Sequence, residues 1–545
     1  MSTASPTASQ NADVPATGRR VEIYDTTLRD GTQGEGFSLS LQDKLNIAVK
    51  LGELGVDYVE GGFPISNPKD EAFFREIRGY KLKHAKISAF GMTRRRGVEA
   101  KDDMTMKALL AAETPVVTIV GKTSDHQVRV VLGVSLEENL SMIGDSVKLI
   151  AGAGREVVYD AEHFFDTFRS NPQYALQTLR AAEKAGAKVL CLCDTNGGTM
   201  PEQIAEAVRR VKQECSAKIG VHTHNDCGLA LANGLAGIMA GADHTQGTMN
   251  GVGERCGNMD LIPMIANLQL KYGIDCLQPG TVKKLTEASR YVYETANMHP
   301  QNGQPYVGVS AFAHKGGMHV HAVQKDASTY EHVSPETVGN ERRVLVSEMS
   351  GASNIVAKAG KKFDIASDKE ALKRVLARVG ELENRGFQFE SAEASFELLL
   401  RKEIGRYEKF FDLLNYRVTT TRLDSTEPVA EATVKLRVRE MEEHRVSEGS
   451  GPVNSLDRAL FKALKNHYAA VADLHLIDYK VRVVNSKDET AATVRVVMEW
   501  RHKVADGSPA TFGTIGVSSN VIDATWQALV DGYEYHLLHV KESAQ

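Results

Sequence analysis

Residues 188–226, KVLCLCDTNGGTMPEQIAEAVRRVKQECSAKIGVHTHND, carry the pattern that decides the fold. An apolar run, KVLCLCD, is followed by a Gly-containing turn and by PEQIAEAVRRVKQE, in which Pro201 stands at a suitable first helical position. A second run, KIGVHTH, comes next. Strand, helix and strand in this order predict one unit of a parallel sheet.

Six similar runs occur elsewhere in the first half of the chain, so that strands are expected to begin near residues 21, 57, 86, 116, 156, 188, 218 and 244. These starts are about 32 residues apart on average, which is the length of a βα unit. Between the first two runs, Ser40 precedes LQDKLNIAVKLGELG and can cap a helix. We predict an α/β fold with a (β/α)8 TIM barrel over residues 21–275.

The remainder of the chain has a different pattern. Residues 276–387 mix helix and loop and predict small linker subdomains. From residue 388, three expected strands (SFELLLRK, YRVTTTR and EATVKLRV) precede an expected helix, GSGPVNSLDRALFKALKNHY. Strands in HLIDYKVRVV, TAATVRVVMEW and ATFGTIGV then lead into the helix SSNVIDATWQALVDGY. This repetition predicts a C-terminal α+β domain, residues 388–545, of duplicated βββα units.

Composition excludes several classes of protein. The 65 basic and 70 acidic residues give a net charge of −5, so we expect neither nucleic acid nor a membrane surface as a partner. Residues 1–20 lack an apolar segment and are expected to be a disordered leader rather than a signal peptide. The six cysteines lack zinc-ribbon spacing and are typical of reduced thiols in a cytoplasmic enzyme.

Active sites of such barrels lie at the C-terminal ends of the strands. His222 and His224 are two apart on an expected strand, so both rings face the same side and can bind one metal ion; a hydrogen-bonded structural pair is the alternative. Asp30, after the first strand, is the expected third ligand, since two histidines and a carboxylate leave positions open for substrate oxygens. Asn258 could add an oxygen, and Asp226 could orient a ligand imidazole.

Other polar residues near the strand ends have two interpretations each. Arg29 could stabilise an oxygen that develops negative charge, or form a structural salt bridge. Thr195 could bind a carboxylate, or it could only stabilise the turn in which it lies. In the linker region, His319 and His321 form a second His-x-His pair with no carboxylate at metal-ligand spacing, so we expect acid–base chemistry from either of them rather than a second metal ion. The run Arg94–Arg96 could meet an anion or form a solvated face.

The segment GVGERCGN, residues 251–258, does not match the dinucleotide fingerprint, because its glycines are spaced differently and it follows the wrong strand. We interpret it as part of the phosphate- and substrate-binding rim of the barrel.

Together, DTTLRDG (25–31), the Glu after the fifth strand, HTHND (222–226) and GVGERCGN resemble the metal-dependent acyl-CoA condensing barrels, which include 2-isopropylmalate, homocitrate and citramalate synthases. The C-terminal repeat resembles the regulatory dimer domain of isopropylmalate and citramalate synthases. EGGFPISNPKDEAFF, AFGMTRRRG, VVYDAEHFFD and SAFAHKGGMHVHAV are most similar to the citramalate-forming branch.

The resemblance implies a role for each matched position. Metal ligands are expected at Asp30, His222, His224 and Asn258. Catalytic roles are expected for Arg29, Glu162 and, from the partner subunit's linker, His319. Substrate contacts are expected from Arg29, Thr195, Asp160 and Asn258, and contacts with acetyl-CoA from Gly251, Gly253, Glu254 and Arg255. The linker departs from the isopropylmalate synthases at HVHAVQKD, which begins at His319 and replaces their HQDG-type run.

The implied reaction condenses acetyl-CoA with pyruvate and water, gives (R)-citramalate and CoA, and depends on Mn²⁺, Mg²⁺ or Zn²⁺. A homodimer inhibited by isoleucine is expected. Leucine-pathway 2-isopropylmalate synthase is the nearest alternative. A metal-dependent amidohydrolase barrel is disfavoured because its His-x-His pair stands on the first strand, and an amino-acid sensor on an inactive barrel is a further alternative.

Overall fold

The computed structural model describes residues 17–345, 363, 368–422, 427–484, 489, 491–503 and 509–543. The described chain forms two units, one of residues up to Phe312 with Glu331–Arg342, and one of Ala313–Tyr330 with residues from Arg343 onward. We describe each unit by itself.

The first unit is a closed barrel of parallel strands in sequence order. Its strands are β1 (Glu22–Asp25), β2 (Tyr58–Gly62), β3 (Lys86–Met92), β4 (Val116–Lys122), β5 (Glu156–Glu162), β6 (Val189–Asp194), β7 (Lys218–Thr223) and β8 (His244–Gly247). Pairing of β1 with β8 closes the ring. All eight predicted strands and the predicted TIM barrel are confirmed.

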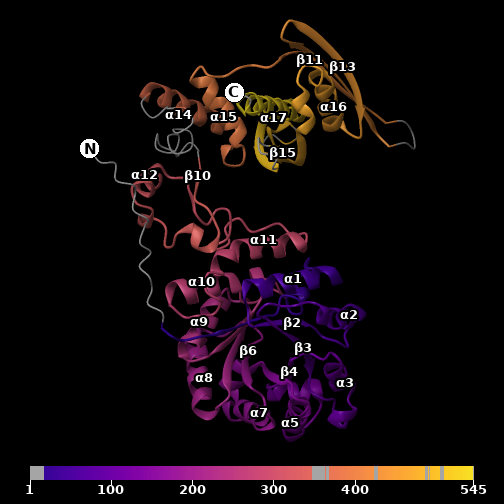
Figure 1. The fold of residues 1–545 in the computed structure, drawn as a ribbon, viewed down its shortest axis with the longest axis vertical. Coiled ribbons are helices and arrows are strands. Elements are labelled where there is room, and N and C mark those ends of the chain that lie inside the picture. Colours follow the sequence, from indigo (N-terminus) through magenta and orange to yellow (C-terminus); the bar gives the residue numbers. More distant parts are fainter. Residues whose placement is uncertain are drawn as a thin grey trace. The chain divides into compact units, whose positions relative to one another are not determined.

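Helices surround the strands, as the indigo-to-magenta part of Figure 1 shows. They are α1 (Leu41–Leu54), α2 (Pro68–Glu76), α3 (Met104–Ala111), α4 (Asp125–Gln127), α5 (Leu136–Gly152), α6 (Phe164–Ser170), α7 (Pro172–Ala185), α8 (Pro201–Glu214), α9 (Ala230–Ala240), α10 (Leu261–Lys271) and α11 (Leu285–Thr295).

The predicted helix starts are confirmed. Ser40 accepts a hydrogen bond from the backbone N–H of Asp43 and caps α1, and Pro201 opens α8. The apolar faces of these helices and the outer faces of the strands share one core. A smaller cluster, which includes Tyr24, Tyr58 and Cys191, contains side chains of five barrel strands.

The N-terminal segment is described only in part. Residues 1–16 of the expected leader lie outside the described residues. Thr17 donates its backbone N–H to Gly273, and Arg20 pairs with Asp275. Residues 17–20 are therefore attached to the barrel by backbone hydrogen bonds.

The second unit contains two three-stranded antiparallel sheets, β11–β12–β13 and β14–β15–β16. Its elements are β9 (Ala313–His314), α12 (Gly317–Lys325), β10 (Arg343–Val344), α14 (Lys369–Asn384), α15 (Glu393–Glu403), β11 (Asp412–Thr421), β12 (Val429–Val438), β13 (Met441–Gly449), α16 (Pro452–Leu464), β14 (His475–Val483), β15 (Val494–Lys503), β16 (Pro509–Ser518) and α17 (Val521–Ser543).

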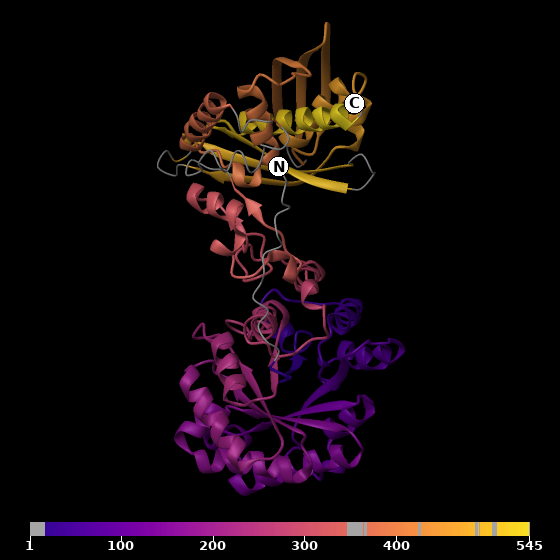
Figure 2. The same ribbon diagram turned by 60° about the vertical axis from the view of Figure 1, so that its left-hand side comes forward.

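Each sheet is covered by the helix that follows it in the chain. Helix α16 packs on β12 and β13, and α17 packs on β15 and β16; in Figure 2 the yellow α17 lies along the yellow strands. The predicted duplicated βββα module is confirmed.

One predicted strand of this module is wrong. SFELLLRK lies in α15, because Phe396 and Leu400 pack in a core shared with α14 and β16. The missing strand is β13, MEEHRVSEG, whose side chains are mostly polar and exposed. A short apolar run such as the three leucines of this segment does not distinguish a buried helix from a strand.

Candidate active site at the mouth of the barrel

The end of β1 and the end of β7 supply the three residues expected to bind a metal ion. Asp30 lies in the turn after β1, where its backbone N–H donates to Thr26. His222 lies on β7, and His224 follows this strand and forms a β-bridge with Asn258. Closure of the barrel brings these segments to one end of the sheet.

The side chains of Asp30, His222 and His224 converge and are buried. Nε2 of His222 lies 3.2 Å from Nε2 of His224 and 3.2 Å from Oδ2 of Asp30. Asn258 donates its side-chain amide to the same oxygen of Asp30 at 2.6 Å. The predicted ligands are thus brought together, with Asn258 at their edge.

This donor set fits a divalent metal ion. Two imidazoles and one carboxylate are typical ligands of Zn²⁺ and of first-row divalent ions. Nδ1 of His224 and Oδ1 of Asn258 are buried and have no hydrogen-bond partner among the described residues. The converging atoms are Nε2 of both histidines and Oδ2 of Asp30, so the fit to a metal ion rests on these donors, and the unpartnered Nδ1 of His224 lies on the other side of its ring.

The electrostatics of the three residues are strongly coupled. Burial acts to raise the pKa of Asp30, but Arg29 and His222 outweigh it and hold this pKa well below its ordinary value. Burial acts to lower the pKa of His222, and Asp30 reverses this and raises it. Burial and the neighbouring His222 lower the pKa of His224 to about 4.

Arg29 is held from three sides. Its Nε donates to Oε2 of Glu60 at 2.6 Å, its Nη1 lies 3.0 Å from Oδ1 of Asp30, and its guanidinium lies 3.9 Å above the ring of Phe90. Arg29 therefore makes a salt bridge, as one interpretation expected, and this salt bridge fixes it beside the metal-ligand set.

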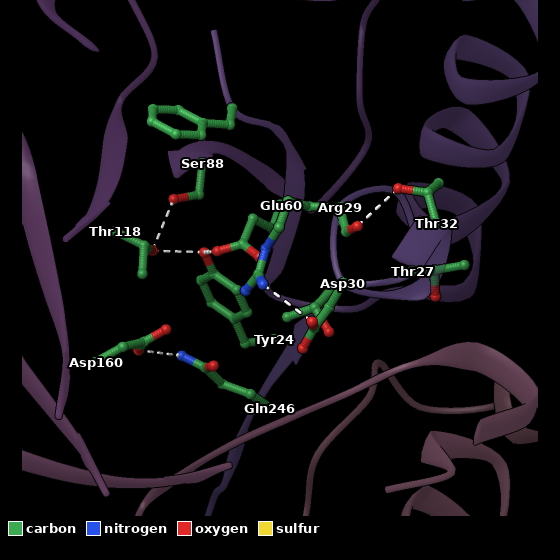
Figure 3. A network of polar contacts seen from close by, with 12 residues as sticks. Tyr24, Thr27, Arg29, Asp30, Thr32, Glu60, Ser88, Thr118, Asp160 and Gln246 are labelled. Atoms are coloured by element: carbon green, nitrogen blue, oxygen red, sulfur yellow. Dashed lines mark hydrogen bonds and ion pairs between the residues drawn. The ribbon is translucent and has the colours of Figure 1, made fainter. Parts of the chain in front are cut away.

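Glu60 was not among the residues predicted from the sequence. This carboxylate is buried on β2 and also accepts a hydrogen bond from the hydroxyl of Tyr24 at 2.8 Å. Figure 3 shows Tyr24 and Glu60 between Arg29 and Thr118. An acidic residue within the apolar strand YVEGG is the signal that could have identified it.

Gln246 on β8 was missed as well. Its Oε1 lies 2.8 Å from Nδ1 of His222, and its amide nitrogen donates to Oδ1 of Asp160 at 2.9 Å. Asp160, expected to contact substrate, is buried on β5. Burial raises the pKa of Asp160, and the charges of His222 and Arg29 oppose this shift.

Glu162 and Thr195 lie at neighbouring strand ends. Glu162, the last residue of β5, forms an ion pair of 2.6 Å with Lys122 at the end of β4. The hydroxyl of Thr195 accepts a hydrogen bond of 2.9 Å from the backbone N–H of His163. Its hydroxyl hydrogen is therefore left to donate to another group.

The glycine-rich segment forms a tight loop after β8. Gly251 and Gly253 have positive φ angles of 67° and 158°, and a Cβ atom at Gly253 would lie 2.1 Å from Oδ1 of Asn258. Arg255 forms ion pairs with Asp226 and with Glu254 in this loop. The expectation that Asp226 orients a ligand imidazole is wrong, because its carboxylate binds Arg255 instead.

The arginine run after β3 is held by contacts within the first unit. Arg94 is buried and pairs with Glu138 and Asp145, and Arg95 pairs with Asp103. Arg96 donates to the carbonyl of Gly133. The charges of Arg94 and Arg95 are therefore paired with carboxylates of the first unit.

His319 and His321 belong to the second unit, on α12. Both are exposed, and the ring of His319 stacks on Tyr330 with a centroid separation of 4.2 Å.

All six cysteines are free thiols, as expected. Among the described residues, no helix has the length and apolar character needed to cross a bilayer.

Comparisons with known proteins agree with this geometry. The HMGL-like family matches residues 20–292, the homocitrate synthase post-HMGL domain-like family matches 306–386, and the LeuA allosteric (dimerisation) domain matches 390–537.

Full-length relatives were also found. The (R)-citramalate synthase of Geobacter sulfurreducens is 49% identical over 95% of this chain and 97% of its own. That of Aquifex aeolicus is 49% identical over 96% of this chain and 99% of its own. The 2-isopropylmalate synthase of Methanocaldococcus jannaschii is less similar, at 29% identity over 96% of both chains.

Proposed function

The chain belongs to the family of (R)-citramalate synthases, with an HMGL-like barrel and a LeuA-type dimerisation domain, and from this premise we propose how its residues perform the condensation. The reaction condenses acetyl-CoA with pyruvate and water and releases (R)-citramalate and CoA. The observation that carries this proposal is the convergence of Asp30, His222 and His224 beside Arg29 at the mouth of the barrel.

A divalent cation would be held by Asp30, His222 and His224, with Asn258 at its edge. When bound, such an ion polarises the ketone of a 2-oxo acid and fixes its orientation. Mn²⁺, Mg²⁺ and Zn²⁺ all remain compatible with this donor set.

The groups around this set orient pyruvate and stabilise charge. Thr195 donates its hydroxyl hydrogen to the carboxylate of pyruvate, since His163 already occupies its acceptor side. Arg29, held by Glu60, directs a fixed positive charge at the ketone oxygen as that oxygen becomes an alkoxide. Because this charge exists only after the new bond forms, the interaction lowers the barrier rather than the ground state.

The acetyl group must lose a proton before it attacks. We assign the removal of a methyl proton of acetyl-CoA to Glu162, acting with or through His319 of the partner subunit. The resulting carbon forms a bond with the ketone carbon of pyruvate. Water then hydrolyses the thioester, which releases CoA and makes the overall reaction irreversible. Gly251, Gly253, Glu254 and Arg255 are assigned to the rim that holds CoA.

The three matched family ranges support a division into catalytic, linker and regulatory parts. The dimerisation domain supports a dimer with effector regulation, and we assign isoleucine as the effector. The free cysteines support our proposal of a cytoplasmic location.

Steady-state release of CoA thiol tests the activity. With acetyl-CoA present, pyruvate should be used with a higher kcat/KM than 3-methyl-2-oxobutanoate. A preference for the branched acid would instead assign the chain to leucine biosynthesis. Absence of thiol release with any 2-oxo acid would support a non-catalytic amino-acid sensor.

A further inference from the structure

A chain of three buried side chains leads away from the metal-ligand set into the barrel. Nδ1 of His222 lies 2.8 Å from Oε1 of Gln246, and Nε2 of Gln246 donates to Oδ1 of Asp160 at 2.9 Å. Gln246 is fully buried, and Asp160 is 3% exposed. Figure 3 shows the carboxylate of Asp160 facing the amide of Gln246.

The hydrogen bond between Gln246 and Asp160 sets the direction of the hydrogen bond between Gln246 and His222. Oδ1 of Asp160 accepts from Nε2 of Gln246, so the NH₂ group of this amide faces Asp160. The amide oxygen of Gln246 then faces His222 and accepts from Nδ1. His222 is therefore in the tautomer that carries its hydrogen on Nδ1, and the lone pair of its Nε2 points toward Asp30 and His224.

The second histidine has no such support. Nδ1 of His224 is buried and has no partner among the described residues. Among the described residues, only His222 of the pair therefore has a partner on the nitrogen that faces away from the expected ion, and such partners fix the tautomer and ring orientation of metal-binding histidines.

We infer that Gln246 and Asp160 are positioning residues that hold His222 in the metal-binding tautomer, Gln246 directly and Asp160 through Gln246. This inference rests on the metal site of the proposed function. It gives Asp160 a role other than the substrate contact expected from the sequence.

Replacement of Gln246 tests the first link. Mn²⁺ affinity is measured on the metal-free full chain by competition with a chelating indicator, without substrate. Gln246→Leu should weaken Mn²⁺ binding about 10- to 100-fold, the usual effect of losing such a partner. Thr245→Val is the matched control: Thr245 is buried on the same strand and its hydroxyl contacts Met259, so this variant should bind Mn²⁺ as tightly as the wild type.

A double-mutant cycle tests the second link. Asp160→Leu frees the Gln246 amide to reverse, so this variant should also bind Mn²⁺ more weakly. If Asp160 acts only through Gln246, the double variant Asp160→Leu/Gln246→Leu should bind no more weakly than Gln246→Leu alone. Additive losses in the double variant would overturn the role given to Asp160.

The outcomes separate this inference from the proposed function. Folding of each variant is checked by circular dichroism, and Gln246→Met, which keeps side-chain length, replaces Gln246→Leu if the latter does not fold. A folded Gln246 variant that binds Mn²⁺ like the wild type overturns the inference and leaves the function standing. A wild-type chain that binds no divalent ion overturns the metal site itself, and the inference with it.

Discussion

Nε of Arg29 donates to Oε2 of Glu60 at 2.6 Å, and this contact joins the turn after β1 to the middle of β2. Glu60 is fully buried and also accepts from Tyr24. The guanidinium therefore cannot rotate away without depriving the buried carboxylates of Asp30 and Glu60 of this cation, which is costly.

Glu60→Gln should lower kcat about 10- to 100-fold with a small change in KM, because Arg29 acts on charge that develops after substrate has bound. Steady-state kinetics of CoA release measures both constants. Glu156→Gln is the control. Glu156 is a barrel carboxylate paired with Lys86, and it lies at the start of β5, at the end of the barrel opposite the candidate site. Equal kcat values for Glu60→Gln and the wild type would contradict a role for Glu60 in holding Arg29.

His222→Ala and His224→Ala should each abolish turnover and the retention of a divalent ion while the barrel stays folded. Each substitution removes one of three converging donors; His222 lies on a strand that is paired on both sides, and His224, which follows it, is bridged to Asn258. Metal content per chain after gel filtration, together with circular dichroism, provides the measurement. Full activity in either variant would be incompatible with the proposed ligand set.

His319→Ala and Arg29→Ala should each be inactive alone and should partly complement each other when the two chains are co-expressed. If His319 acts on the partner's barrel, half of the dimers are mixed and each mixed dimer has one intact site, so activity should reach about a quarter of the wild type. Co-expression of either variant with itself is the control. Complete inactivity of the mixed preparation would mean that each site is built within one chain.

Removal of the C-terminal domain should abolish inhibition by isoleucine more completely than it lowers activity. The structure places the cut before α14 rather than at residue 388, because Val375 and Val379 of α14 share a core with α15 and β16. Inhibition curves of the full chain and of the chain ending at Asp368 provide the comparison. Isoleucine inhibition that survives the truncation would place the effector site elsewhere.

Glu534→Gln should change how the stability of the C-terminal unit depends on pH. Burial raises the pKa of Glu534 to about 7, although a hydrogen bond from Tyr407 opposes the shift. A carboxyl group with a raised folded-state pKa contributes stability below its unfolded pKa, near 4.5, and loses this contribution as pH rises to about 7. The loss is up to about 3 kcal/mol.

Urea unfolding followed by tryptophan fluorescence measures this effect, since both tryptophans, Trp500 and Trp526, lie in the second unit. The wild type should lose unfolding free energy between pH 5 and 8, and Glu534→Gln should lose less. Glu440→Gln, at an exposed position, should behave like the wild type. Parallel pH profiles for wild type and Glu534→Gln would refute the buried-carboxyl explanation.

The sequence by itself determined the barrel, its strand order and the main polar groups at its mouth. Each βα unit is encoded locally, by an apolar run and a helical pattern within about 32 residues. Once a barrel is predicted, residues that follow its strands must meet at one end, and this places Asp30, His222 and His224 together. The duplicated C-terminal module was predictable for a similar reason, since repetition requires no knowledge of long-range contacts.

Only the tertiary structure decided which buried polar groups support that site. Glu60 and Gln246 stand inside strands whose residues are all buried, so no alternation along the sequence shows which side chains face the barrel interior. Their partners Arg29 and Asp160 lie 31 and 86 positions away. The same limit explains SFELLLRK, because only packing against α14 and β16 makes a helix of that run. Local sequence pattern determines which segments form the strands and helices of the barrel. Closure of the barrel determines which of their buried polar side chains pair with one another.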